Sequence, residues 1–337
     1  MTAQRGAVVV RYGALGDMVM TTAVLRALHT RHGAPCTVVG LGGWVPSLLA
    51  NLPSVGAIHT IKSRKAPYLF CPDQWALVRE LKKYHGHPVY VLAGDERAAA
   101  LVKRAGLTIT SSCYLTKHIP NEHQVDNHAR VAGFDPATYD RRPKLIVTEQ
   151  ERTDCLAWKN ARFGSAPIVL LQAGNKKTMS WRKRSNDVKS WPVERWVSVI
   201  RAVLAHDPTI KIALNGAPIE REMTDAIVTA AGDPRVCSIA GEAPLRRLFA
   251  LLTLAHSTIS VDTGPAHAAA ALGCPLVVLF GSTDPRINGP VSSTAPVAIV
   301  TGPANAPIAD GEAGWAAHHH MEAVTVEAVI SAWKNLK

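Results

Sequence analysis

The sequence predicts an α/β protein made of two doubly wound, Rossmann-like domains. Short β-branched apolar runs alternate with helical segments along the chain, as in parallel sheets that helices cover on both faces. The 337 residues fit two domains of roughly 150 residues each. A stretch rich in proline and charge, residues 135–144, leads toward a linker between them. We therefore place the domains at residues 1–150 and 151–320, with a terminal helix within 321–337.

The first half opens with a strand, a glycine turn and a helix. We expect the strand at Ala7–Arg11 and the helix from Met18 to about Arg31, joined by Gly13-Ala14-Leu15-Gly16-Asp17. The spacing G-x-x-G-D differs from the dinucleotide fingerprint, and Asp17 would put a negative charge where a pyrophosphate sits, which disfavours an NAD module. Further strands are expected at Cys36–Leu41, Ala57–Ile61 and Pro88–Leu92, and further helices at Val45–Asn51, Asp73–Lys83 and Ala98–Ala105.

Residues 118–132 are polar for their length and are typical of a surface helix. On that interpretation Glu122, His123, Asp126 and His128 are solvated. His123 and Asp126 are three residues apart, but the sequence offers no evident third ligand, so we predict no metal site there.

The second half continues the alternation of strands and helices. Strands are expected at Ile168–Leu171, Ile210–Leu214, Thr258–Val261 and Leu276–Phe280, and helices at Thr148–Phe163, Val193–His206, Glu220–Ala231, Leu245–Ala255 and Thr325–Leu336. A tract rich in Pro, Gly and Ala runs from Pro285 to about Gly314.

The stretch from Thr258 to Pro285 is the most informative part of the chain. A buried strand is followed by Asp262-Thr263-Gly264-Pro265 and a short helix, and the helix N-terminus is expected at the carboxyl end of the strand. Free N–H groups and the helix dipole suit a phosphate there. The alternative is an ordinary strand–turn–helix in which Asp262 or Thr263 caps the helix.

Composition narrows the class of protein. The formal net charge of +11 favours an anionic partner: nucleic acid, a membrane surface or a phosphorylated substrate. No apolar run reaches the roughly 20 residues of a membrane span, and the N-terminus does not look like a signal peptide. The six cysteines are scattered without a CxxC pair, as expected for reduced core thiols in a cytosolic protein.

Three segments carry a resemblance to a known family. Residues 262–285, DTGPAHAAAALGCPLVVLFGSTDP, resemble the nucleotide-sugar-binding motif of glycosyltransferase family 9, the lipopolysaccharide heptosyltransferases. Residues 8–28, VVVRYGALGDMVMTTAVLRAL, resemble the N-terminal signature of that family, and residues 190–196, SWPVERW, resemble a third block. The resemblance implies the GT-B architecture, two Rossmann-like doubly wound domains facing across a cleft, with the last helix packing back on the N-terminal domain.

The resemblance also implies an activity. It is inverting, metal-independent transfer of heptose from ADP-L-glycero-β-D-manno-heptose to the lipopolysaccharide inner core, without a cofactor. The family places its base at the aspartate of the GD motif, here Asp17, and Gly13 and Gly16 leave room for the acceptor. The residues alone favour Asp17 as a helix cap, and it is the resemblance that favours the base.

The donor side of the site is predicted in the second half. By resemblance, Lys189 contacts the donor phosphate and His267 contacts the donor, and the amides of Thr263 and Gly264 form a diphosphate nest. Glu220 is a candidate for the ribose hydroxyls, or a solvated carboxylate at a helix start. The remaining candidates are Asp262 for the sugar hydroxyls, and Gly174 and Asn175 after the first strand of this half.

Three cations of the first half are candidate acceptor contacts. Lys62, Arg64 and Lys65 follow a strand, and the lipopolysaccharide inner core is rich in carboxylates and phosphates. The alternative is a solvated loop. The resemblance implies a cytoplasmic enzyme at the inner face of the bacterial inner membrane, in peripheral contact with the anionic surface.

Other functions stay open at this point. The basic segment 176–189 is longer than in many family members and contains Trp181, which is compatible with a lid or with a nucleic-acid contact. No recognised nucleic-acid motif occurs, so we expect no such partner. Transfer from another nucleotide-sugar or to another acceptor, and a nucleotide-sugar-binding protein without turnover, are the remaining alternatives.

Overall fold

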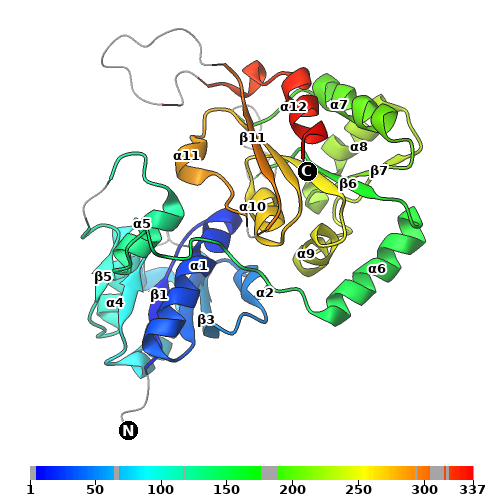
Figure 1. Cartoon of the computed structure of the whole chain (residues 1–337). Helices are drawn as coiled ribbons and strands as arrows, with labels where there is room; N and C mark the ends of the chain where they lie inside the picture. Colours follow the sequence, from blue (N-terminus) through cyan, green and yellow to red (C-terminus); the bar gives the residue numbers. More distant parts are fainter. Residues whose placement is uncertain are drawn as a thin grey trace. The chain divides into compact units, whose positions relative to one another are not determined.

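The computed structural model of the protein describes residues 5–63, 68–116, 119–175, 189–292, 294–303, 315 and 319–336. The chain separates into two compact units, Met1–Ile146 and Val147–Lys337, drawn in blue to green and in green to red in Figure 1. The boundary lies at residue 146 rather than at the predicted 150. The reason is that Thr148 already caps the first helix of the second unit, where its hydroxyl accepts from the backbone N–H of Glu151 at 3.2 Å.

The first unit contains a parallel sheet with the strand order β3-β2-β1-β4-β5. All three residues of its central strand are buried valines, as expected for a strand covered on both faces. The helices α1, α2 and α5 lie together, as do α3 and α4. In chain order the elements are β1 (Val8–Val10), α1 (Leu15–His32), β2 (Cys36–Leu41), α2 (Val45–Leu49), β3 (Val55–Ile61), the 3₁₀ turn η1 (Tyr68–Phe70), α3 (Pro72–Leu81), η2 (Lys82–Tyr84), β4 (Val89–Val91), α4 (Glu96–Arg104), β5 (Ser111–Ser112) and α5 (Gln124–Val131).

Helix α5 buries His128, which we predicted to be solvated. The side chain is fully buried because α5 packs on α1. Burial, and then the nearby Arg11 charge, lower the pKa of His128 well below its usual value, so the ring is neutral. The three other residues that we interpreted as solvated also have partners: Glu122 bonds Arg130, the His123 ring accepts from the backbone N–H of Val125, and Asp126 pairs with Arg141.

The second unit contains a parallel sheet with the strand order β11-β10-β9-β6-β7-β8. Figure 1 shows α7, α8 and α12 on one side of it and α6, α9 and α10 on the other. In chain order the elements are α6 (Glu149–Phe163), β6 (Ile168–Gln172), α7 (Val193–His206), β7 (Lys211–Leu214), η4 (Pro218–Glu220), α8 (Arg221–Ala231), β8 (Val236–Ser238), α9 (Leu245–Leu252), β9 (Ser257–Val261), α10 (Gly264–Ala271), β10 (Leu276–Phe280), α11 (Pro285–Asn288), β11 (Val297–Thr301), η6 (Met321–Ala323) and α12 (Val326–Lys334).

Helix α12 packs against α7, β10 and β11 of the second unit. Its Val329 and Trp333 are buried in the core of this unit. The indole N–H of Trp333 donates to the hydroxyl of Ser257 in β9 at 2.9 Å. The apolar face of α12 therefore completes the core of the second unit.

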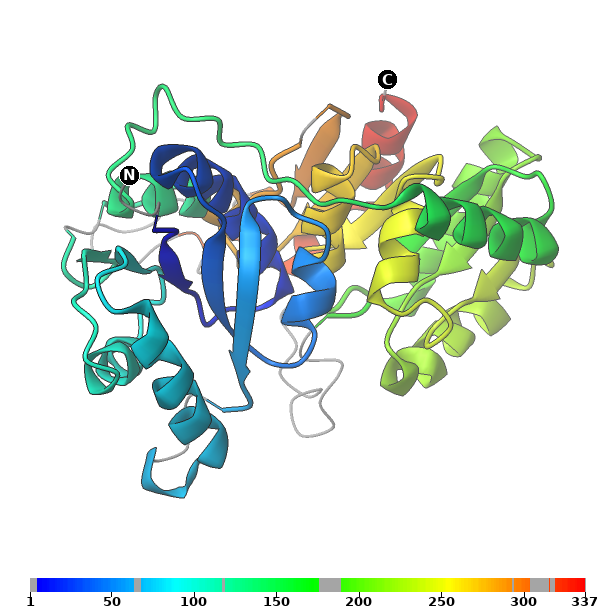
Figure 2. The same ribbon diagram turned by 90° about the horizontal axis from the view of Figure 1, so that it is seen from below.

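The start of α6 is tied by charge to α9, and the two helices lie side by side in Figure 2. Arg246 of α9 donates to both carboxylate oxygens of Glu151 in the first turn of α6. This hydrogen bonding by Arg246 lowers the pKa of Glu151 to about 2. The pair explains why α6 belongs with the second unit although it directly follows the first.

All six cysteines are free thiols in the structure, as we predicted for core residues. Four of them are buried and two, Cys113 and Cys237, are half-buried. Burial raises the pKa of Cys36 to about 12, which keeps this thiol protonated.

Each sheet has one point at which the strand order reverses. In the first sheet it lies beside β1, which pairs with β2 on one side and with β4 on the other. In the second sheet it lies beside β6, which pairs with β7 and with β9. Open α/β sheets bind ligands at the carboxyl ends of strands at such points. The candidate site residues therefore follow β1 and β4 in the first unit, and β6 and β9 in the second.

Candidate functional site

Asp17 lies in the first turn of α1, just beyond the carboxyl end of β1. The N-cap residue Ala14 has no side-chain oxygen, so Asp17 reaches back and its Oδ2 accepts from the backbone N–H of Ala14 at 2.7 Å. Its Oδ1 accepts from Nη2 of Arg11 at 3.0 Å. The side chain remains 29% exposed. Asp17 is therefore a helix cap and also an accessible carboxylate at the point where the strand order reverses.

Arg11 is a residue of this site that the sequence analysis did not single out. Its Nη1 donates to the carbonyl of Leu92 after β4 at 2.7 Å, while Nη2 holds Asp17. The Arg11 side chain is only 11% exposed. It therefore joins the exits of β1 and β4 and fixes the Asp17 carboxylate between two donors. The sequence feature that could have identified Arg11 is its place directly after an all-valine strand and six residues before Asp17.

The two glycines of the turn, Gly13 and Gly16, have different surroundings. A Cβ at Gly13 would lie 2.5 Å from the Cβ of Asp17 and 2.7 Å from its Oδ2, so any larger residue would displace the carboxylate. Gly16 is buried in the first turn of α1. Gly13 is therefore required by the position of Asp17.

Of the three predicted acceptor cations, only Lys62 belongs to the described residues. Its backbone N–H donates to Oδ2 of Asp73 at the start of α3, at 2.8 Å, and the residue is exposed. Arg64 and Lys65 lie outside the described residues. The backbone of Lys62 is thus fixed by Asp73, while its side chain is exposed to solvent.

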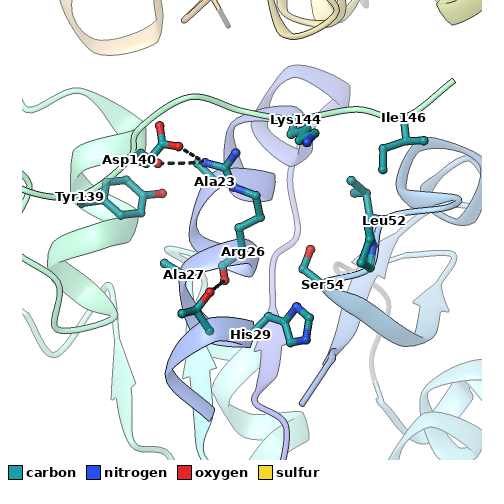
Figure 3. A pocket seen from close by; sticks show the side chains of 12 residues that line it. Ala23, Arg26, Ala27, His29, Leu52, Ser54, Tyr139, Asp140, Lys144 and Ile146 are labelled. Carbon is teal, nitrogen blue, oxygen red and sulfur yellow. Dashed lines mark hydrogen bonds and ion pairs between the residues drawn. The ribbon is translucent and has the colours of Figure 1, made fainter. Parts of the chain in front are cut away.

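The first unit also contains a pocket of about 390 Å³, which Figure 3 shows beside the last turns of α1. Arg26 reaches across it and donates to Oδ2 of Asp140 at 2.8 Å. Residues 52–54 of its wall precede β3, so the pocket lies toward the amino ends of the strands. None of the predicted site residues lines it, which separates it from the Asp17 turn.

In the second unit Lys189 and Asp262 come together at the carboxyl end of β9. Nζ of Lys189 forms an ion pair with Oδ2 of Asp262 and also lies 3.3 Å from the Asp262 carbonyl. The Asp262 side chain is only 6% exposed, whereas that of Lys189 is 29% exposed. Neither Asp262 nor Thr263 caps α10 with its side chain, contrary to the alternative that we left open, because Lys189 holds the carboxylate.

His267 and the start of α10 complete this cluster. Nε2 of His267 lies 3.9 Å from Oδ1 of Asp262, and both side chains are 6% exposed. Helix α10 begins at Gly264, next to the N-cap Thr263. The positive end of α10, an ammonium group and an imidazole therefore surround one carboxylate, an arrangement that suits an anionic ligand with hydroxyl groups.

Glu220 is buried, which overturns its interpretation as a solvated carboxylate. It is 3% exposed, and its Oε2 accepts from the backbone N–H of Ala217 at 2.7 Å. A Cβ at Gly174 would lie 2.0 Å from Oε1 of Glu220, so the glycine allows the two loops to meet. The exits of β6 and β7 are therefore packed against each other through Glu220.

A second contact joins the same two loops. Nε2 of Gln172 donates to the carbonyl of Gly174 at 2.9 Å, and Nδ2 of Asn215 donates to Oε1 of Gln172 at 2.6 Å. Asn175, a predicted donor contact, is buried beside them. The sequence analysis missed Gln172 and Asn215, because an amide at the end of an apolar strand has no distinctive pattern.

The comparisons with known proteins agree on one family. Residues 74–307 match the model of "Glycosyltransferase family 9 (heptosyltransferase)". The chain belongs to glycosyltransferase family 9. It is 34% identical over 285 residues to lipopolysaccharide heptosyltransferase 3 of Escherichia coli. This alignment covers 80% of this chain and 81% of that protein.

Solved structures of the family share the architecture of the chain. A family 9 glycosyl transferase from Veillonella parvula has a TM-score of 0.77 at 18% identity, covering 100% of this chain and 98% of that one. The E. coli ADP-heptose LPS heptosyltransferase II has a TM-score of 0.72 at 19% identity, covering 98% of each chain. The predicted GT-B class, with two Rossmann-like domains, is thereby confirmed.

For this family 9 chain, the predicted residues form groups within each unit. Asp17 and Gly13 are in contact in the first unit, and Lys189, Asp262 and His267 cluster in the second. Glu220 and Gly174 form a second group there. The matched residues 74–307 include the two groups of the second unit but not Asp17, whose assignment rests on its geometry and on the N-terminal motif.

Proposed function

We propose that this glycosyltransferase moves heptose with inversion from ADP-L-glycero-β-D-manno-heptose to the lipopolysaccharide inner core. The observation that carries the proposal is the Lys189–Asp262–His267 cluster at the start of α10 in a family 9 chain. Such a cluster suits a donor with a diphosphate and a hydroxylated sugar. The lipopolysaccharide heptosyltransferases of E. coli to which the chain is similar support the choice of sugar and acceptor.

In this mechanism Asp17 is the general base. Its carboxylate takes the proton of the acceptor hydroxyl while the hydroxyl oxygen attacks the anomeric carbon of the heptose. Attack from the face opposite the diphosphate breaks the bond to ADP and inverts the configuration. The two donors on Asp17, Arg11 and the Ala14 amide, hold the carboxylate in one orientation while leaving it accessible.

The second unit would stabilise the departing ADP. Lys189 and the amides of Thr263 and Gly264 meet the charge that develops on the diphosphate. His267 contacts the donor phosphates, and Asp262 accepts from sugar hydroxyls. Glu220, with Gly174 and Asn175 beside it, binds the ribose hydroxyls, since a buried carboxylate between two loops is a strong acceptor.

The first unit would bind the acceptor. Gly13 and Gly16 give it access to Asp17, and Lys62, Arg64 and Lys65 pair with its carboxylates and phosphates. The acceptor is then a lipid-linked, anionic molecule at the cytoplasmic face of the inner membrane. The net charge of +11 favours such a surface.

The choice of nucleotide is tested by thermal unfolding in the presence of ADP, UDP and GDP. A ligand that binds only the folded state raises the melting temperature, and we expect the largest rise with ADP. A transfer assay with ADP-heptose then follows release of ADP in the presence of acceptor. A larger rise with UDP or GDP would favour another nucleotide-sugar, and ADP binding without transfer would favour a non-catalytic binding protein.

Activity is expected to be unchanged by EDTA. The charge of the leaving diphosphate is met by Lys189 and by helix amides, so the reaction has no step that needs a divalent cation. The measurement is the initial rate of transfer after dialysis against EDTA, with and without added magnesium or manganese. A rate that falls with EDTA and returns with either metal would contradict metal-independent transfer.

A further inference from the structure

Three large apolar side chains are exposed around the 3₁₀ turn η1 and the start of α3. The exposed fractions are 70% for Leu69, 76% for Phe70 and 46% for Trp75. We call these three residues the apolar patch. Single exposed apolar side chains are common on protein surfaces, but a contiguous group of this size usually marks an interaction site.

The fold holds this turn so that Leu69 and Phe70 face outward. Tyr68 packs toward the core of the first unit, and the Arg104 guanidinium lies 4.5 Å from its ring centre. The indole N–H of Trp75 donates to the Tyr68 carbonyl at 2.7 Å. The inward residue and this hydrogen bond fix the turn, so the exposure of its two neighbours is built into the local structure.

The residues before the turn are also anchored to α3. Besides the bond from Lys62 to Asp73, Nε2 of Gln74 donates to the carbonyl of Ser63 at 3.0 Å. Lys62 is a proposed acceptor contact, and Asp73 lies two residues before Trp75. The apolar patch therefore lies close along α3 to Lys62, one of the residues proposed to bind the acceptor.

Cations flank the apolar patch along α3. Trp75 and Arg79 are four residues apart and share a helix face, and Lys83 continues the row in η2. Arg79, Lys82 and Lys83 are all exposed. The acidic residues of this segment already have partners, since Asp73 accepts from Lys62 and Glu80 pairs with Lys83. An exposed aromatic and aliphatic group beside a row of cations is the pattern of a surface that binds at a lipid interface.

We propose that the apolar patch docks the first unit on an anionic bilayer surface, with Leu69, Phe70 and Trp75 in the interface and Arg79 and Lys82 against lipid phosphates. This inference rests on the proposed function, because a lipid-linked acceptor lies at such a surface. Among the helices that the structure describes, none is long and apolar enough to cross a membrane. Docking of this kind combines buried apolar area with attraction to anionic lipid, so it weakens as salt increases.

The test is co-sedimentation with vesicles of phosphatidylcholine and phosphatidylglycerol, compared with vesicles of phosphatidylcholine alone. The full-length protein is expected to bind the anionic vesicles more tightly and to lose binding as salt increases. The double variant Leu69→Ser with Phe70→Ser should weaken binding to anionic vesicles by about tenfold or more, because it removes most of the inserted apolar area. The matched control is Leu115→Ser, which changes another leucine with 70% exposure, located after β5 at the other edge of the sheet.

Further measurements separate this inference from the proposed function. The double variant should unfold at the wild-type temperature and transfer heptose to a delipidated, water-soluble acceptor at the wild-type rate. Equal binding of the wild type to neutral and anionic vesicles would contradict the proposed docking surface, and so would an equal loss of vesicle binding in Leu115→Ser. Neither result would bear on the proposed transfer reaction. The wild type could instead self-associate without binding vesicles, and lose this self-association in the double variant. That result would assign the patch to contact with a second copy of the chain and would contradict membrane docking. Vesicle binding is read without activity, so it stands even if ADP-heptose is not the donor.

Discussion

Replacing Asp17 with asparagine is expected to lower kcat by about 10²–10⁴-fold, the usual contribution of a positioned general base. Asparagine keeps an oxygen for the Ala14 amide but cannot take the acceptor proton, and it loses the charge that pairs with Arg11. The affinity for ADP should stay unchanged, because Asp17 lies in the first unit and the donor cluster in the second. Steady-state transfer and ADP titration measure the two quantities. Asp17→Ala should lose transfer to the same extent and also lose the helix cap.

The structural role of Asp17 requires a control. Loss of the negative charge at the start of the helix costs roughly 0.3–1 kcal/mol of stability, which can lower activity through unfolding. Asp126→Asn is a matched variant, since Asp126 is also in the first turn of a helix in the same unit, pairs with Arg141 and is 23% exposed. Both variants should lower the unfolding temperature by a similar amount, but only Asp17→Asn should lose turnover. Near-normal turnover in Asp17→Asn would remove Asp17 from the role of base.

The start of α1 illustrates what the sequence could and could not predict. The strand, the glycine turn and the helix were predicted at the right places, because their apolar periodicity is local. We started the helix at Met18, but it begins at Leu15, since the cap is Asp17 reaching back to a residue with no capping side chain. The ion pair with Arg11 was not predicted. The second hydrogen bond of Arg11, to the carbonyl of Leu92, depends on β1 and β4 being neighbours in the sheet.

The edge of the second sheet and the α10 loop show the same limit. The sequence analysis did not predict β11, which follows Pro285 and pairs with β10 from Leu276↔Val297 to Phe280↔Thr301. It is an edge strand with Ile299 44% exposed, and so lacks the fully buried pattern that marks the inner strands. Similarly, Asp262 looked like a helix cap because local preferences favour it. Lys189, 73 residues away, takes its carboxylate instead.

Replacing Lys189 with alanine is expected to lower kcat by about 10²–10³-fold, the range for losing one charge-stabilising group at a reacting centre. The loss has two parts. The leaving diphosphate loses an ammonium partner, and Asp262, only 6% exposed, is left as an unpaired carboxylate at the donor site. The second part repels the diphosphate, so ADP should also bind more weakly. Lys334→Ala, in the last turn of α12, removes the same charge from the chain and should leave both quantities unchanged.

A double-mutant cycle separates the two parts. Asp262→Asn removes the carboxylate that Lys189→Ala would leave unpaired, so the double variant should bind ADP better than Lys189→Ala alone. Its transfer rate should stay low, because neither the ammonium group nor the sugar contact is present. If Lys189→Ala keeps the wild-type ADP affinity and transfer rate, Lys189 serves only to hold Asp262. The charge of the leaving group must then be met by the amides at the start of α10 and by His267.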